Sequence, residues 1–364
     1  MEKSTTTSGS RKPKRSSANS ILLLILIAGL LLGNIWRESR GLNGLVECRL
    51  PSAAGNNHTV TANSYAVDEM ERLRRLAKYF QTYRYIPPAP RYEALDPIPS
   101  KACGSGPDFE PWWKLDTKQR SRLNEDRKIY EIFFKDDFPD HKGTYLELGA
   151  YNGMDESNSR FFDVCLGWKG LLIEGNPVVY PRTIESRPYA HKMSLAPSCS
   201  AEYEAVNKTI PFFKQKWTNG GLVGHAKAYT TNKTSIVHVP CAPLSPILQD
   251  VFANDNDDDD DETNHTTRSL PTLDFFSLDV EGSEALVLST IDFRAVQINI
   301  FLIEVFNAFC KDNNCEVRRR VRAKLQAEGY KRYEGLVIQS DVYVHPSSPF
   351  QVPLWVTNSK NPVG

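Results

Sequence analysis

Carboxylates at the ends of strand-like segments are the residues of this sequence best suited to chemistry. Acids are uncommon in buried strands, because removing a charge from water is costly unless the charge is paired. The carboxyl ends of parallel strands meet at one edge of a sheet, so we expect these acids to share a ligand site. A structural role is the alternative for any one of them. The acids at these strand ends are Glu147 in "YLELGAYNG", Glu174 in "GLLIEG", Asp279 and Glu281 in "FFSLDVEG", and Glu304 in "FLIE".

The turn after the first of these strands narrows the choice of ligand. "GAYNG" fits neither GxGxxG nor GxxxxGK[ST], which disfavours a P-loop and the pyrophosphate cradle of a nicotinamide-dependent oxidoreductase. Acids instead suit a ligand with a ribose and a positive charge. Glu174 lies 25 residues after Gly149, a spacing suited to an acid that accepts hydrogen bonds from ribose hydroxyls. Glu147 is placed to offset an amino or sulfonium charge. The pattern predicts S-adenosylmethionine as cofactor.

Four blocks of sequence also resemble one known family. "YLELGAYNG", "GLLIEGNP", "FFSLDVEGSEALVL" and "FLIEVF" are similar to the FkbM-type family of S-adenosylmethionine-dependent methyltransferases, over about residues 140–335. "SLDVEGSE" is the most specific of these blocks. The resemblance implies an α/β fold, a Rossmann-like seven-stranded class I methyltransferase sheet with helices on both faces. It also implies O-methylation of hydroxyls on sugars or natural products. The stretch 201–270, long and extended with an acidic loop, departs from the compact bacterial pattern.

The resemblance further implies a role for each matching position. Glu174 would hold the ribose, and Asp279 and Glu281 would face the transferred methyl group. Residues Met193 and Ser194, followed by Leu195, would lie beside the adenine. The methionine end of the cofactor would be lined by Glu147, Gly149, Asn152 and Gly153.

A sugar hydroxyl is a poor nucleophile until its proton begins to leave, so a catalytic base is expected. Asp279 is the first candidate and Glu281 the second, although Glu281 could instead cap the helix that follows it. His225 is an alternative base or an ordinary loop residue. No metal is expected. A divalent ion held by Asp279, Glu281 and Glu304 is the less favoured hypothesis.

The elements that must position these residues alternate between strand-like and helix-like segments. Such alternation predicts a parallel sheet covered by helices on both faces, with antiparallel strands added at its ends. Expected strands are 143–150, 169–175, 274–282 and 298–306, with a strand pair over 330–345 and shorter extended pieces at 190–196, 201–207, 209–215 and 235–244. Expected helices are 156–166, 177–187, 283–291 and 315–328.

The N-terminal third of the chain predicts a membrane anchor. "ILLLILIAGLLLGNIW" (21–36) follows a basic flank, which the positive-inside rule keeps in the cytosol. A cleaved signal peptide and a buried helix are the alternatives. The sequons at Asn57, Asn207, Asn232 and Asn264 all lie on the predicted lumenal side. We therefore expect a single-pass type II glycoprotein of the Golgi or endoplasmic reticulum.

The remaining boundaries follow from composition. We expect a cytosolic tail (1–20), the anchor (21–36), a stem or linker (37–110), a methyltransferase-like domain (111–350) and a C-terminal tail (351–364). Apolar residues at helical spacing over 65–85 predict either a stem helix or a helix packed on the domain. The acidic insertion 254–263 predicts a solvated loop, since it lacks the spaced ligands and the glycine of a calcium loop.

Seven cysteines lie beyond the predicted anchor, and none forms a CxxC pair that would suggest zinc. An oxidising lumen favours disulfides, with Cys310–Cys315 and Cys199–Cys241 as expected pairs. Core packing is expected for Trp112, Trp113 and Trp217, with stacking on a sugar ring as the alternative.

Two functions remain after this reading. With 44 basic and 44 acidic residues and no basic stripe, nucleic acid is not an expected partner. The first function is an O-methyltransferase for a hydroxyl of a glycan or glycoconjugate in the secretory lumen. The second is a catalytically inactive relative that acts in binding or trafficking of secretory cargo. The complete set of acids and glycines favours the enzyme.

Overall fold

The computed structural model describes residues 62–90, 101–104, 108–225, 235–252, 270–305, 315–354 and 356. The predicted cytosolic tail, the predicted anchor and the acidic insertion 254–263 lie outside these ranges. Of the helices in the described ranges, none combines the length and the apolar character that a membrane crossing requires.

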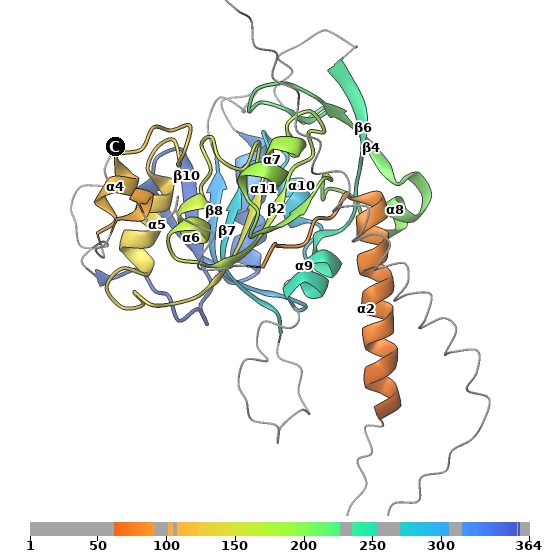
Figure 1. The fold of residues 1–364 in the computed structure, drawn as a ribbon, viewed down its shortest axis with the longest axis horizontal. Helices are drawn as coiled ribbons and strands as arrows, with labels where there is room; N and C mark the ends of the chain where they lie inside the picture. Colours follow the sequence, from red (N-terminus) through yellow and green to blue (C-terminus); the bar gives the residue numbers. More distant parts are fainter. Residues whose placement is uncertain are drawn as a thin grey trace, which may run out of the picture. The chain divides into compact units, whose positions relative to one another are not determined.

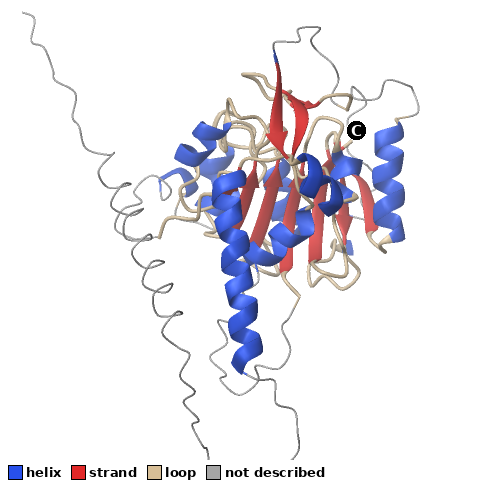
Figure 2. Ribbon diagram, turned by 90° about the vertical axis from the view of Figure 1, so that its right-hand side faces the viewer, coloured by secondary structure: helices blue, strands red, loops and turns tan. Residues whose placement is uncertain are grey.

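A seven-stranded sheet forms the centre of the molecule (Figure 2), in the order β3-β2-β1-β7-β8-β10-β9. Five strands run parallel: β1 (Thr144–Leu148), β2 (Lys169–Ile173), β3 (His191–Met193), β7 (Thr272–Leu278) and β8 (Gln297–Glu304). The edge pair β9 (Lys331–Val337) and β10 (Ser340–Val344) is antiparallel to its neighbours. The central strands are continuous apolar runs because both faces of the sheet are buried. The predicted seven-stranded α/β sheet is confirmed.

The direction of winding reverses between β1 and β7. The chain passes from β1 outward to β2 and β3, and then returns to place β7 on the other side of β1. Leu148 at the end of β1 pairs in register with Leu278 at the end of β7. The N–H of Asp279 donates to the carbonyl of Leu148 at 3.1 Å. This switch point is where doubly wound sheets bind ligands.

Helices cover the sheet on both faces (Figure 1). Successive residues of a strand point to opposite faces, and Tyr145 and Leu146 accordingly belong to different core clusters. One cluster includes α2 (Ala62–Thr82), α9 (Leu244–Phe252), α10 (Glu284–Leu288) and α11 (Glu316–Ala327). The other includes α4 (Glu110–Trp113), α5 (Glu125–Phe133) and α6 (Arg160–Val164). The short helix α7 (Tyr180–Ser186) lies between β2 and β3 in the chain.

The helix predicted over 65–85 is present as α2, and it packs on the domain. Arg75 and the Tyr79 hydroxyl both bind the carboxylate of Asp250 in α9, at 2.8 and 2.7 Å. Tyr79, Tyr83 and Tyr85 are buried. The packed unit therefore begins at about Ala62, well before the boundary that the sequence suggested at residue 111.

A second, smaller sheet lies within the predicted extended stretch. Its strands β4 (Thr209–Phe213), β5 (Gly221–Leu222) and β6 (Ile236–Pro240) pair antiparallel, with β4 in the middle. In Figure 2 it rises beyond one end of the large sheet. Residues 201–207 were expected to be extended, but they form α8, whose first turn is capped by the Ser200 hydroxyl.

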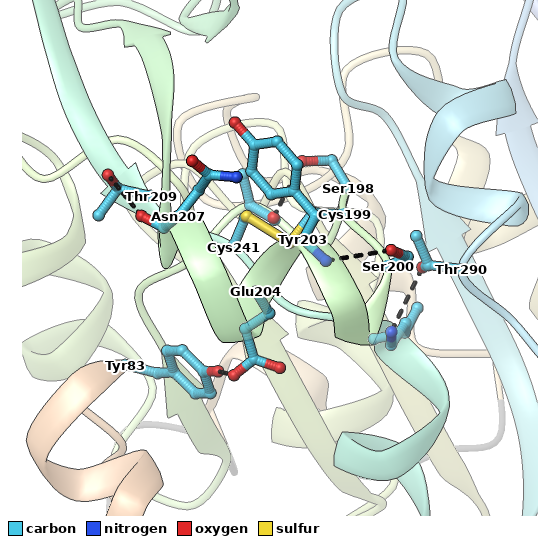
Figure 3. The surroundings of a disulfide bond; sticks show 12 residues. Tyr83, Ser198, Cys199, Ser200, Tyr203, Glu204, Asn207, Thr209, Cys241 and Thr290 are labelled. Atoms are coloured by element: carbon cyan, nitrogen blue, oxygen red, sulfur yellow. Dashed lines mark hydrogen bonds between the residues drawn. A yellow bond between two sulfur atoms is a disulfide. The ribbon is translucent and has the colours of Figure 1, made fainter.

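Two disulfides tie loops to this framework. Cys199–Cys241 is present as predicted and joins the segment before α8 to the end of β6 (Figure 3). Cys103–Cys165 was not predicted, and it links the segment before α4 to the end of α6. Cys315 is also disulfide-bonded. The predicted pair Cys310–Cys315 stays a prediction, since residue 310 lies outside the described ranges.

Candidate functional site

A cavity of about 320 Å³ lies at the carboxyl ends of the parallel strands. This is within the range of small-ligand sites. The strands β1, β2, β7 and β8 each place an acid or a glycine turn on its wall. Of the residues singled out in the sequence, Glu147, Gly149, Glu174, Asp279, Glu281 and Glu304 line it. The expectation that these strand ends share one site is confirmed by the geometry.

Gly149 allows the loops after β1 and β7 to touch. It has a φ of +89°, and a Cβ at this position would lie 1.7 Å from the carbonyl oxygen of Asp279. No other residue type fits this contact without displacing one of the two strands. The glycine thus brings the bare backbone of one loop against the backbone carbonyl of the other, and both residues line the cavity.

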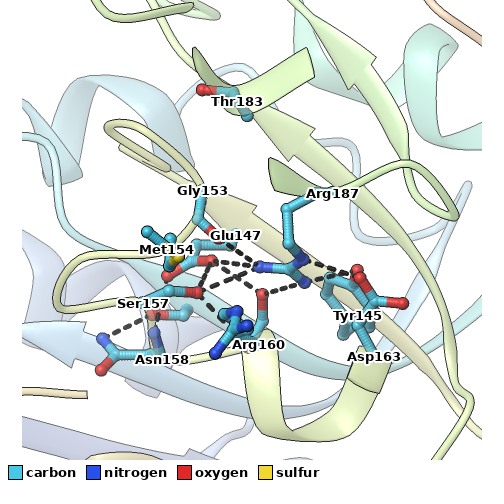
Figure 4. Close-up of polar contacts among 12 residues, drawn as sticks. Tyr145, Glu147, Gly153, Met154, Ser157, Asn158, Arg160, Asp163, Thr183 and Arg187 are labelled. Atoms are coloured by element: carbon cyan, nitrogen blue, oxygen red, sulfur yellow. Dashed lines mark hydrogen bonds and ion pairs between the residues drawn. The ribbon is translucent and has the colours of Figure 1, made fainter. Parts of the chain in front are cut away.

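Glu147 is held by internal partners, which differs from the cofactor role expected for it. One carboxylate oxygen accepts the Asn158 N–H at 2.7 Å, and the other accepts the hydroxyls of Ser157 and Ser159, both at 2.7 Å. The buried Arg187 guanidinium lies 3.7 Å away (Figure 4). With its charge compensated in this way, Glu147 shapes the loop 149–159 and is not a free anion for a cationic ligand.

Arg187 anchors this network from the α7 side. It also binds Asp163 at 2.7 Å and the Tyr145 hydroxyl at 2.7 Å, and all three side chains are buried. The network joins α6, β1 and the residue that ends α7 (Figure 4). The sequence did not reveal this network, because Arg187 lies 24 residues or more from its partners and belongs to none of the motifs.

Glu174 is placed as the sequence predicted. Its two carboxylate oxygens accept the backbone N–H groups of Tyr151 and Asn176, at 2.7 and 2.6 Å. Each oxygen therefore has one internal donor and keeps a lone pair for a ligand. Burial raises the pKa of Glu174 to about 7, although the two backbone donors lower it. Such a carboxylate can accept two neighbouring hydroxyls at once.

Four predicted cofactor residues do not line the cavity. Asn152 accepts the N–H groups of Met154 and Asp155 and so closes the turn after β1. Gly153 has a φ of +76° and packs against Ser186 and Arg187. Met193 is fully buried in the core, and the Ser194 N–H donates to the carbonyl of Tyr83. The neighbouring segment 195–198 lines the wall instead.

Asp279 and Glu304 form a close carboxyl pair across β7 and β8. Burial, followed by the charge of Asp279, raises the pKa of Glu304 to about 11, and burial also raises the pKa of Asp279. Both groups therefore hold a proton more readily than an isolated carboxyl group does. An acid in this position can accept the proton or the hydrogen bond of a hydroxyl brought into the cavity.

Glu281 lies in the turn between β7 and α10 and also faces the cavity. Its φ is +56°, an uncommon conformation for a residue with a side chain, which is typical of functional sites. Burial and the charge of Asp279 raise its pKa to about 8. Glu284 braces the turn that leads into α10, since its carboxylate accepts the N–H groups of Val280 and Gly282.

The small sheet supplies the wall that the sequence could not assign. Phe212 of β4 and Leu222 of β5 line the cavity with the glycine pair Gly220-Gly221. Gly175 lets the Phe212 ring approach the end of β2, since a Cβ there would lie 2.8 Å from it. His225 is exposed and does not line the cavity.

The tryptophans lie away from the site. Trp112 and Trp113 are buried in the core on the α5 face of the sheet, as expected. Trp217 is 71% exposed, so the expected core role is wrong for this residue. Its neighbours Thr218 and Asn219 line the cavity.

Comparison with known proteins identifies the family of this chain. The family model of the methyltransferase FkbM domain matches residues 147–332. The fold is also similar to the crystal structure of Aeropyrum pernix fibrillarin in complex with natively bound S-adenosyl-L-methionine, at 10% identity and a TM-score of 0.28. That match covers 56% of this chain and 66% of the fibrillarin chain. A search of curated proteins finds no match.

Proposed function

This chain belongs to the FkbM methyltransferase family, and from that premise we propose that it is an O-methyltransferase for a hydroxyl of a glycan or glycoconjugate in the secretory lumen. The family domain is an S-adenosylmethionine-dependent methyltransferase domain. The observation that carries the proposal is one cavity in which Glu174, the Gly149 turn and Asp279 meet at the switch point of the sheet.

The residues present fit this cofactor. When bound, S-adenosylmethionine supplies a methyl group already activated on a sulfonium centre. Glu174 offers two acceptor oxygens for a ribose diol, and Gly149 places bare backbone on the wall of the same cavity. The apolar side chains of Leu195 and Phe212 line the same cavity and offer contact area for a flat base.

The chain itself has a limited task in the reaction. Most of the rate of such a displacement can come from holding the reacting groups in line, which the rigid strand ends and the Glu147–Arg187 network support. Asp279 accepts the hydrogen bond of the attacking hydroxyl, and with Glu304 it offers a place for the departing proton. Glu281 is the second candidate for this role.

The acid-rich wall favours a neutral acceptor. The carboxylates of Asp155, Glu156, Asp279 and Glu281 line the cavity, and Arg122 is the one basic residue among the described lining residues. A sulfated or carboxylated sugar would be repelled by this surface, whereas neutral hydroxyls can donate to it. A neutral sugar is therefore the acceptor that the wall suits best.

The proposed compartment rests on sequence and on the disulfides. The apolar run 21–36 behind a basic flank supports a retained type II anchor in the Golgi or endoplasmic reticulum. Two disulfides in the domain fit an oxidising lumen. Asn207 is exposed at the end of α8, where a glycan could be attached. A mobility shift on deglycosylation that is smaller in Asn207→Gln than in wild type would support this topology.

The direct test of the proposal is glycan mass spectrometry. Glycans from cells that lack the protein are compared with glycans from the same cells after re-expression of wild type or of Asp279→Asn. We expect a sugar that is lighter by one CH₂ group in the deficient cells, restored by wild type and not by the variant. Identical glycan profiles in the three samples would contradict the proposed acceptor class.

A further inference from the structure

Three carboxylates converge beside the cavity from separate elements. Asp279 directly follows β7, Glu304 is the last residue of β8, and Glu284 is the first residue of α10. The register of β7 against β8 pairs Leu278 with Ile303 and so sets Asp279 beside Glu304. One oxygen atom from each of the three lies within 4.8 Å of the others. The sequence had suggested, as a less favoured hypothesis, a divalent ion held by Asp279, Glu281 and Glu304.

Polar atoms without partners lie at the same place. The hydroxyl of Ser283 has no hydrogen-bond partner, although the residue is only 2% exposed and lines the cavity. One carboxylate oxygen of Glu304 is likewise buried and receives no hydrogen bond. Buried polar atoms nearly always have a partner, so orphaned atoms call for an explanation such as a bound ion.

Several other buried acids have a basic side chain beside them, whereas Glu125, Asp126 and Glu174 are held by hydrogen bonds alone. Glu147 and Asp163 lie against Arg187, Asp250 is paired with Arg75, and Asp341 is paired with Arg322. Within the described ranges, no lysine, arginine or histidine lies within 4 Å of the carboxylates of Asp279, Glu284 or Glu304. Glu284 is buried, Asp279 and Glu304 are only partly covered, and among the described residues no cation compensates the group, which is an arrangement that a metal ion can balance.

We propose that Asp279, Glu284 and Glu304 bind a hard divalent cation, Mg²⁺ or Mn²⁺, with the Ser283 hydroxyl beside it. An all-oxygen ligand set is the type that these ions prefer, and no sulfur or imidazole belongs to the cluster. Glu284 uses one oxygen to hold the turn 280–282 and keeps the other for the ion. This site goes beyond the proposed methyl transfer, and its occupancy can be measured without any acceptor.

The test is titration of the full-length protein with Mn²⁺, in which electron paramagnetic resonance reports the free ion. We expect one tight site per chain in the wild type, and binding at least about tenfold weaker in Glu304→Gln. The control is Glu156→Gln, which removes the same charge from the same cavity outside the cluster. The acidic insertion 254–263 could bind Mn²⁺ weakly, but that binding would be the same in every variant.

Two outcomes would overturn the proposal. One is a wild-type protein without a tight site, and the other is an equal loss of affinity in Glu156→Gln and Glu304→Gln. If Glu304→Gln does not fold, Asp279→Asn takes its place with the same expectation. Binding of S-adenosylmethionine, measured on the same samples, separates a failure of the metal site from a failure of the proposed function.

Discussion

At the scale of single residues, Glu174 is the acid whose surroundings best fit ligand binding. Its two backbone donors fix the orientation of the carboxylate while leaving acceptor capacity on both oxygens. Its pKa of about 7 is above the value of about 4.5 expected for the unfolded chain. Near neutral pH the group is therefore divided between a charged form, which only accepts hydrogen bonds, and a neutral form.

We expect the affinity for S-adenosylmethionine to fall as the pH is lowered from about 8 to about 6. Protonation of Glu174 removes one of the two acceptors that a ribose diol needs. Calorimetric titration at several pH values measures this, and Glu174→Gln should bind about tenfold or more weakly at the higher pH, with a flatter pH profile. Glu185→Gln, a change on the exposed side of α7, is the control. Equal profiles for wild type and Glu174→Gln would contradict the assignment.

The raised pKa of Glu281 predicts a stability that depends on pH. The pKa of Glu281 in the folded chain, about 8, lies above its pKa in the unfolded chain. Between these two pKa values the folded chain binds more protons than the unfolded chain, so its stability decreases as the pH rises through 8. In the presence of a chelator, the melting temperature of the wild type should fall more steeply between about pH 6 and about pH 9 than that of Glu281→Gln. Parallel curves would show that Glu281 titrates normally.

At the scale of elements, the contact between the loops after β1 and β7 holds the site together. Gly149→Ala should destabilise the protein by more than about 2 kcal/mol, because the new methyl group would overlap the Asp279 carbonyl and one loop must move. Urea unfolding measures the change in the free energy of unfolding.

The matched control for this change is Gly329→Ala. Gly329 has a φ of +84°, close to that of Gly149, but nothing lies within 4 Å of the added Cβ. Its substitution carries only the conformational cost of a left-handed residue, of order 1 kcal/mol. Equal losses of stability in the two variants would contradict the loop contact as the reason for Gly149.

The sequence predicts the large sheet well because its strands are long apolar runs ending in distinctive residues. It fails for α8, which buries none of its side chains and depends on the Ser200 cap, so its hydrophobic pattern carries no helical signal. α9 was missed because its apolar residues follow directly on an extended run and include Pro246. Pairing partners for Glu147 could not be predicted, since Arg187 is distant in the chain.

At the scale of the whole molecule, disulfides and long-range packing join the added segments to the sheet. The α2 helix contacts α9 through Asp250, and Cys103–Cys165 ties the region before α4 to α6 across 62 residues of chain. The sequence alone could not choose among pairings of its seven cysteines. Of the expected pairs, Cys199–Cys241 is present, and the acids at the ends of β1, β2, β7 and β8 line one cavity.

Loss of the Cys103–Cys165 bond should lower stability by up to about 4 kcal/mol, since a loop of this length is released in the unfolded chain. The double variant Cys103→Ser/Cys165→Ser, compared with wild type by thermal unfolding under oxidising conditions, measures this. Addition of reductant should lower the wild-type melting temperature by more than that of the variant. A wild-type melting temperature unaffected by reductant would contradict a stabilising role for the disulfides.

The central claim is that the cavity at the β1–β7 switch point binds S-adenosylmethionine, and calorimetric titration of the full-length protein tests it most directly. We predict saturable binding of one equivalent per chain with a dissociation constant in the micromolar range, displaced by S-adenosylhomocysteine and abolished in Glu174→Ala. No heat with millimolar S-adenosylmethionine, from a protein shown to be folded by its cooperative melting, would contradict the account.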